Sequence, residues 1–114
     1  MVWPAKSRFF DYDGVLDSYK TATELVDGLF LPAGEAWRVA WNYDSELMLY
    51  GPDQFHPSAL GTYLAALVMY QKFSGRDPRE LPDEMPSTNW PFPVSEEEVR
   101  TMQSAAYEVN QRYP

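Results

Sequence analysis

The chain has 114 residues, a length that allows one domain, and its 45% apolar and 16% aromatic content predicts a packed core. A formal net charge of -8 argues against nucleic acids and anionic membranes as partners, because both require a clustered Lys/Arg face, and no apolar run reaches membrane-spanning length. The chain has no cysteine and one histidine, which excludes disulfides, thiolate nucleophiles, zinc-sulfur sites and multi-histidine metal sites.

The first third of the chain predicts a helix followed by a short strand. The Asp17-Ser18 pair can cap the helix, and Gly28 stands where a left-handed C-terminal residue is needed. The apolar face of this helix consists of Tyr19, Ala22, Leu25 and Val26. Residues 29–31 are all apolar and precede Pro32, which indicates a buried strand. With residues 1–3 as a candidate neighbour, we expect a small parallel sheet with exposed apolar surface.

Two further helices are predicted in the middle of the chain. Residues 34–43 and 57–73 both carry apolar side chains at helical spacing, and the second run is apolar over a wide face. Three aromatic residues follow this spacing, so we expect them to pack in the core rather than to form a ligand platform; they are Trp37, Trp41 and Tyr63.

The last third of the chain predicts a long loop and a final helix. Residues 76–94 contain five prolines, which forbid a long helix or a central strand. We expect an extended surface segment that packs Trp90 and Phe92 onto the domain. Ser95 and Glu98 have the spacing of a capping box, which predicts that the last helix begins there.

The loop before the third helix carries the clearest candidate for chemistry. Asp53 precedes His56 by three residues, and the helix follows directly. This spacing allows the carboxylate to hold the Nδ1 proton while Nε2 faces a cleft, which makes the imidazole a directed base. The alternative is structural, with His56 at the start of the helix and Asp53 in a loop turn. The first interpretation requires a carboxylate oxygen of Asp53 within hydrogen-bond reach of His56 Nδ1.

Two segments resemble the C-terminal half of the SGNH (GDSL-type) serine hydrolases. Residues 53–58 (DQFHPS) and the helix that follows, from LGTYLAA at 60–66 to Gly75, are similar to the last sequence block of the family, in which Asp-x-x-His precedes a closing helix. Residues 28–37 resemble the strand-to-helix stretch before that block. The resemblance covers residues 1–75 and implies a partial three-layer α/β/α fold, flavodoxin-like and mostly helical in this segment. Residues 1–114 would form the C-terminal part of a single domain whose nucleophile-bearing N-terminal part is absent.

The same resemblance implies a function. In this family the nucleophile is a Ser in a Gly-Asp-Ser block, and two further blocks supply the oxyanion hole. No Gly-Asp-Ser occurs in this chain, so only two catalytic residues carry over: Asp53, which orients the imidazole, and His56, the base. The implied reaction is hydrolysis of a small-molecule ester or an acylated carbohydrate, with no cofactor, by a chain that is inactive alone. The implied partners are the substrate and either the missing N-terminal half or a second copy of the chain.

Two other interpretations remain open. One is a non-catalytic α/β module that keeps the Asp53 to His56 loop as a structural remnant. The other is a Mg²⁺-dependent phosphatase, because residues 9–18 (FFDYDGVLDS) look like the first motif of the haloacid-dehalogenase type. In that motif Asp11 would be the nucleophile and Asp13 the acid/base. The polar, proline-broken residues 4–8 do not form the buried strand that this motif needs, so we expect a solvated turn instead.

Overall fold

The computed structural model describes residues 1–86 and 90–114, and every regular element in these ranges is helical. The α-helices are α1 (Tyr12–Leu25), α2 (Ala33–Tyr43), α3 (Ala59–Ser74) and α4 (Glu96–Arg112), and two short 3-10 helices are η1 (Lys6–Asp11) and η2 (Pro78–Glu80). The only extended pairing in the described chain is one isolated antiparallel bridge between Tyr50 and Pro57. No described helix is both long and apolar enough to cross a membrane.

The expected α/β fold is therefore wrong for this structure. Residues 28–31 are extended but belong to no strand. Their nearest backbone partner is the N-terminus, where the Met1 amino group donates to the Leu31 carbonyl at 2.7 Å and the Gly34 N–H donates to the Met1 carbonyl at 3.4 Å. Two bonds around one residue do not make a ladder, because a strand needs a neighbour along its length to satisfy its backbone groups. The predicted parallel sheet and the three-layer arrangement are absent from the described residues.

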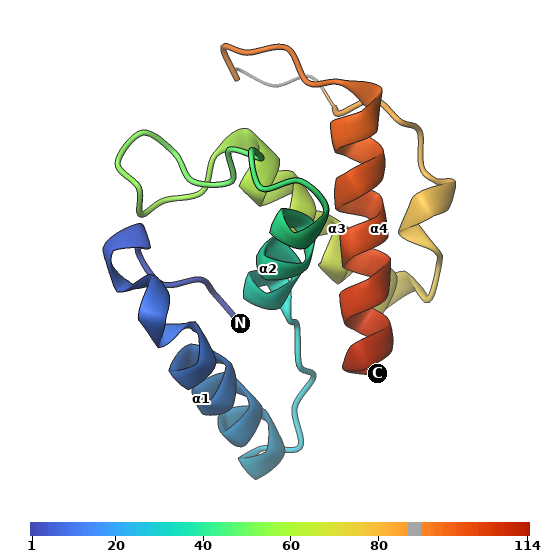
Figure 1. The fold of residues 1–114 in the computed structure, drawn as a ribbon. Helices are drawn as coiled ribbons and strands as arrows, with labels where there is room; N and C mark the ends of the chain where they lie inside the picture. Colours follow the sequence, from blue (N-terminus) through green and yellow to red (C-terminus); the bar gives the residue numbers. More distant parts are fainter. Residues whose placement is uncertain (87–89) are drawn as a thin grey trace.

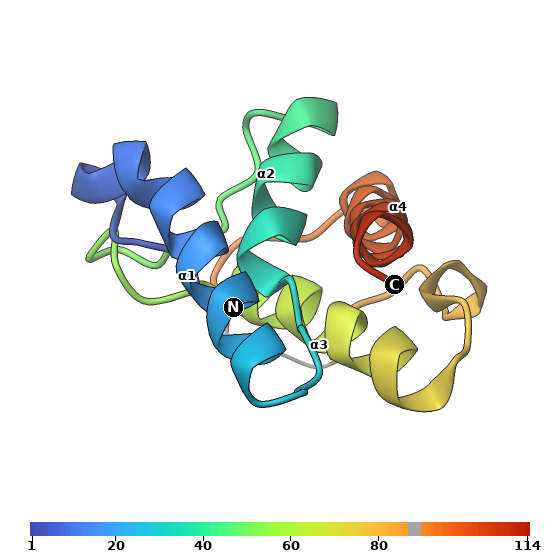
Figure 2. The same cartoon turned by 90° about the horizontal axis from the view of Figure 1, so that it is seen from below.

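The core lies where α2, α3 and α4 pack against one another, and α1 lies beyond α2, away from α4 (Figures 1 and 2). Trp37 on α2 is at its centre with no exposed surface, as the helical spacing predicts. The Trp3 ring stacks on the Trp37 ring with centroids 3.9 Å apart, so the N-terminal segment covers one side of the core. Burying a side chain of this size contributes roughly 2–3 kcal/mol.

α3 approaches α2 closely because it carries a glycine at the contact. The Gly61 carbonyl accepts a hydrogen bond from Trp37 Nε1 at 3.2 Å. A Cβ at position 61 would lie 2.2 Å from the Leu49 carbonyl oxygen and 2.5 Å from the Trp37 ring, which are distances that atoms do not adopt. The absence of a side chain at position 61 therefore allows α3 to pack closely against the Trp37 ring of α2 and the Leu49 backbone of the loop between them.

The ends of the later helices follow the local rules of the sequence. The Ser58 hydroxyl caps α3 by accepting from the Gly61 N–H, and Gly75 ends α3 with a left-handed φ of 71°. Ser95 and Glu98 form the predicted capping box of α4. Residues 81–86 and 90–95 contain no helix or strand, and Trp90 packs against the core as predicted, whereas Phe92 is 53% exposed.

The N-terminal helix departs most from expectation. α1 begins at Tyr12 rather than at residue 17 or 18, so the run expected to form a solvated turn is helical. Tyr12 is its only buried residue, and Leu25 and Val26 at its far end are more than three-quarters exposed. Exposed apolar side chains are also present outside this helix, for example Phe55 in the loop before α3 and Phe73 on α3, and none of them lies at the edge of a sheet in the described residues.

Candidate functional site

The loop between α2 and α3 is a tight backbone structure that leads into the N-terminus of α3. The Gly51 N–H donates to the His56 carbonyl at 2.7 Å, and the Ser58 N–H donates to the Leu49 carbonyl at 2.8 Å. Gln54 turns the chain between these bonds with a left-handed φ of 57°. Both ends of the loop are thus fixed to buried residues, while the residues between them face solvent.

Asp53 and His56 meet at the tip of this loop. Asp53 Oδ2 lies 2.5 Å from His56 Nδ1, as the directed-base interpretation requires. The other oxygen, Oδ1, accepts the backbone N–H groups of Phe55 at 3.0 Å and His56 at 2.9 Å. The imidazole side chain is 72% exposed, so the ring is open to solvent and points away from the helical core.

The electrostatics of the pair fix the place of the proton. Hydrogen bonding from His56, together with the backbone N–H groups of Phe55 and His56, lowers the pKa of the Asp53 carboxyl from 3.8 to about 2. An ionised carboxylate only accepts, so this contact favours the neutral tautomer whose ring proton lies on Nδ1. Nε2 is then the atom that carries a lone pair, and it is the atom that a general base uses.

Ser58, the serine nearest to His56 in sequence, has a structural role. It is 4% exposed, and its hydroxyl donates to the Met48 carbonyl at 2.6 Å while it accepts from the Gly61 N–H at 3.1 Å. The hydroxyl therefore caps α3 as an acceptor and holds the Met48 carbonyl of the loop as a donor. No serine in the described parts of the chain is hydrogen-bonded to His56, so the contact of the imidazole with Asp53 has no seryl hydroxyl beside it.

The carboxylates of the phosphatase-like motif are engaged with arginines. Asp11 accepts from Arg8 Nε at 2.7 Å, and Asp13 accepts from Arg38 at 2.8 Å. Arg38 also donates through Nε to the buried Glu35 at 2.6 Å, so Asp13 attaches α1 to α2. Across residues 1–86 and 90–114, no three acidic or histidine side chains come together as a metal site. The geometry therefore gives the Mg²⁺-dependent interpretation no support.

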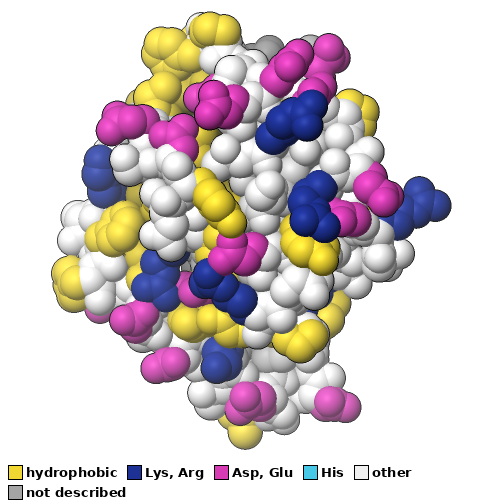
Figure 3. Space-filling model, turned by 45° about the vertical axis from the view of Figure 1, so that its right-hand side comes forward, with side chains coloured by type: hydrophobic (Ala, Val, Ile, Leu, Met, Phe, Trp, Pro, Cys, Tyr) yellow, Lys and Arg dark blue, Asp and Glu magenta, His cyan; other side chains and the backbone are white. Residues whose placement is uncertain are grey.

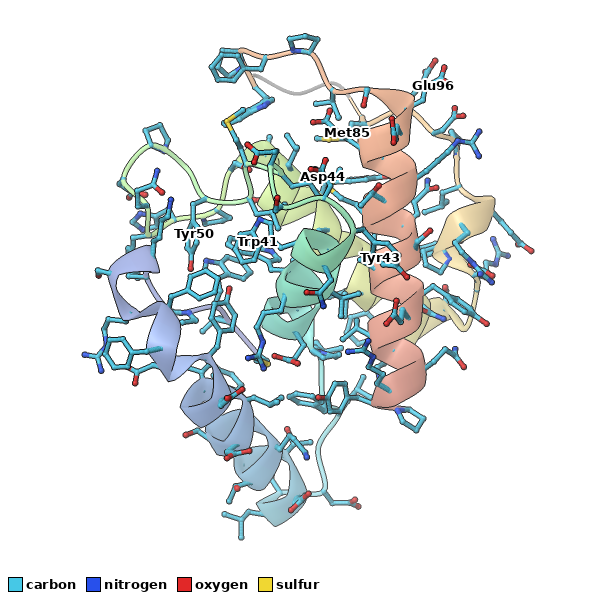
Figure 4. The ribbon with its side chains drawn as sticks, viewed as in Figure 1. Trp41, Tyr43, Asp44, Tyr50, Met85 and Glu96 are labelled. Atoms are coloured by element: carbon cyan, nitrogen blue, oxygen red, sulfur yellow. The ribbon has the colours of Figure 1, made fainter. Side chains whose placement is uncertain are left out.

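A second feature of this region is a cleft of about 700 Å³ beside the same loop. Gly51, Pro52 and Gln54 line one side of it, whereas Asp53 and His56 do not. Its walls combine aromatic side chains with aliphatic and polar ones, and they come from η1, the end of α2, the loop after α2, and residues 90 and 92. Figure 4 shows Trp41 and Tyr50 beside each other in this part of the molecule, and their ring centroids are 5.9 Å apart with the planes inclined by 30°.

The sequence pattern does not reveal this cleft, because its rings come from segments about 80 residues apart in the chain. Helical spacing predicts that Trp41 packs in the core, and it does so on one side while its other side lines the cleft. The one signal in the sequence is the 16% aromatic content, which does not say where the rings gather.

The charged surface shows no large area of one sign on the α4 side of the molecule. Figure 3 shows acidic and basic side chains next to one another over this face. Two such pairs are Arg79 with Asp77 at 2.6 Å and Arg100 with Asp83 at 2.5 Å. These exposed pairs contribute little to stability, because water and salt screen them.

No protein-family model matches this chain, and neither a curated protein nor a solved structure matches it.

Proposed function

We propose that this chain supplies the orienting carboxylate and the general base of a serine-type ester hydrolase, and that the nucleophile comes from another polypeptide segment. The observation that carries the proposal is the contact of 2.5 Å between Asp53 Oδ2 and the Nδ1 of a 72% exposed imidazole. A buried structural histidine would turn its ring into the core, and a plain loop turn would need no partner for the ring.

The local sequence supports the same proposal. The Asp-x-x-His-Pro-Ser run resembles the last block of the SGNH hydrolases, and the serine of that run caps the helix that follows it. Asp53 would orient the ring and stabilise the imidazolium, and His56 would take the proton of a seryl hydroxyl through Nε2 and return it to the leaving alcohol. The substrates of such a pair are esters of small molecules or of carbohydrates.

The proposal is tested by complementation. The chain is mixed with an SGNH-type fragment that bears the Gly-Asp-Ser block, and hydrolysis of p-nitrophenyl acetate is followed. We expect turnover only in the mixture, with a loss of roughly 10⁴-fold or more in His56→Ala and a smaller loss in Asp53→Ala, since the carboxylate acts through the ring. Failure of every such fragment to give His56-dependent turnover would leave the loop as a non-catalytic remnant. Strong turnover by the chain alone would mean that one of its own serines is the nucleophile.

A further inference from the structure

The aromatic cleft beside the loop has no part in the proposed proton transfer, because neither Asp53 nor His56 lines it. Its volume of about 700 Å³ lies within the range of small-molecule sites in proteins. The side chains that define it are Phe9, Trp41, Met48, Tyr50, Trp90 and Phe92.

The walls of the cleft are held in place before any ligand binds. The Tyr50 hydroxyl donates to the Pro4 carbonyl at 2.5 Å, and Trp41 Nε1 donates to the Leu47 carbonyl at 2.9 Å. The Lys6 N–H donates to the Gln54 carbonyl at 2.9 Å, which joins η1 to the loop. A wall fixed in this way loses little conformational entropy on binding.

These hydrogen bonds also determine which groups of the walls remain available to a ligand. The polar atoms of Trp41 and Tyr50 are already used, and the Gln54 side chain donates to the Gly51 carbonyl at 3.3 Å. What remains is mostly ring faces and the Met48 thioether, which recognise apolar groups by contact. The charged lining residues are Lys6 and Glu46, one of each sign, so the cleft favours neither an anion nor a cation.

The ring surfaces of the cleft are incompletely covered. Phe92 is 53% exposed, Met48 50% and Phe9 43%. Covering such side chains with an apolar body is favourable, because each removes apolar area from water.

We infer that this cleft is a separate binding site for a small, uncharged ligand with an aromatic or aliphatic body. The ligand lies against Trp41 and Met48, with Phe9 and Phe92 covering its edges. Binding there requires neither the Asp53 carboxylate nor the His56 imidazole, so the site is independent of the proposed hydrolase chemistry.

The probe for this inference is the uncharged fluorophore N-phenyl-1-naphthylamine, titrated into the full chain. We expect the fluorescence of the probe to rise and to saturate at one bound molecule per chain, accompanied by a change in tryptophan emission. Phe92→Ala should weaken binding about tenfold, the equivalent of one lost aromatic contact of about 1.4 kcal/mol. The matched control is Phe73→Ala, because Phe73 is 70% exposed on α3 and does not line the cleft. This control should bind as the unaltered chain does.

Three results would overturn the inference. Probe fluorescence that does not saturate would indicate non-specific binding to exposed apolar surface. Equal weakening of probe binding in Phe92→Ala and Phe73→Ala would indicate the same. Loss of binding in His56→Ala would place the ligand at the loop tip instead of in the cleft. Because Phe92 is largely exposed, Phe92→Ala should keep the far-ultraviolet circular dichroism of the unaltered chain, and Phe9→Ala provides a second cleft variant with the same expected weakening.

Discussion

Asp53 holds His56 through both of its carboxylate oxygens. Oδ2 contacts the ring at Nδ1 at 2.5 Å, and Oδ1 accepts the backbone N–H of the same residue at 2.9 Å. One side chain therefore fixes both the direction of the imidazole and the turn of the backbone that carries it. This double contact explains how an exposed loop can hold an imidazole in a defined orientation.

The first prediction concerns the ionisation of Asp53. The hydrogen bond from His56 is the largest cause of its lowered pKa, and two backbone N–H groups add to it. In the unaltered chain the carboxyl should titrate at about pH 2, and in His56→Ala its pKa should rise toward the ordinary 3.8 without reaching it. The measurement is the pH dependence of the side-chain carboxyl ¹³C chemical shift.

The lowered pKa of Asp53 determines how the stability of the fold depends on pH. A carboxyl whose pKa is lower in the folded state stabilises the fold above its unfolded pKa, and this contribution is lost as the pH falls toward 2. Asp77 is the internal control, because Arg79 lowers its pKa independently and its midpoint should not move in His56→Ala. An Asp53 midpoint that is unchanged by the loss of the ring would rule out the contact between Oδ2 and Nδ1.

The second prediction concerns the close approach of α3 at Gly61. Gly61→Ala places a methyl group against the Leu49 carbonyl and the fully buried Trp37 ring, so it should destabilise the fold by about 3 kcal/mol. Gly14→Ala is the control, because no neighbouring atom lies within 4 Å of the place that its methyl group would take in α1, and alanine favours a helix by roughly 0.5–1 kcal/mol. The midpoint of urea unfolding should fall for Gly61→Ala and rise for Gly14→Ala. Equal midpoints would contradict the tight packing of α3 on α2.

The third prediction separates Ser58 from catalysis. Ser58→Ala removes the cap of α3 and leaves the Met48 carbonyl without this donor, which should cost about 2 kcal/mol. Ser18→Ala removes only an exposed hydroxyl bond within α1 and should change stability by no more than about 0.5 kcal/mol. Thermal unfolding compares the two. If Ser58→Ala kept full stability and instead abolished His56-dependent turnover, Ser58 would be the nucleophile.

α2, α3 and α4 could be predicted from the sequence because their signals are local, whereas the start of α1 at Tyr12 is not predicted. The capping box at Ser95 and the left-handed Gly75 are properties of a few neighbouring residues, and the structure contains both. The contact between Asp53 and His56 could be predicted for the same reason, since three residues separate them. The capping role of Ser58 is missed from the sequence, because the helical pattern places the start of this helix at residue 57, whereas α3 begins at Ala59.

The features that depend on distant segments could not be predicted. The run Leu29-Phe30-Leu31 has strand composition, but a strand forms only beside another strand, and the backbone that bonds to this run from a distant part of the chain is the N-terminus at Met1. The cleft requires Phe9, Trp41 and Phe92 to line the same pocket, which no periodicity encodes. Long-range packing, not local propensity, decides both.

The most direct test of the central claim is the tautomer of the imidazole. Because the chain has one histidine, its two ring ¹⁵N resonances are unambiguous in a long-range ¹H–¹⁵N correlation spectrum. At a pH where the ring is neutral, the proton should lie on Nδ1 with Nε2 unprotonated, and Asp53→Ala should shift the population toward the Nε2–H form. A predominant Nε2–H form in the unaltered chain, or the same mixture in both proteins, would show that Asp53 does not direct His56 as a base.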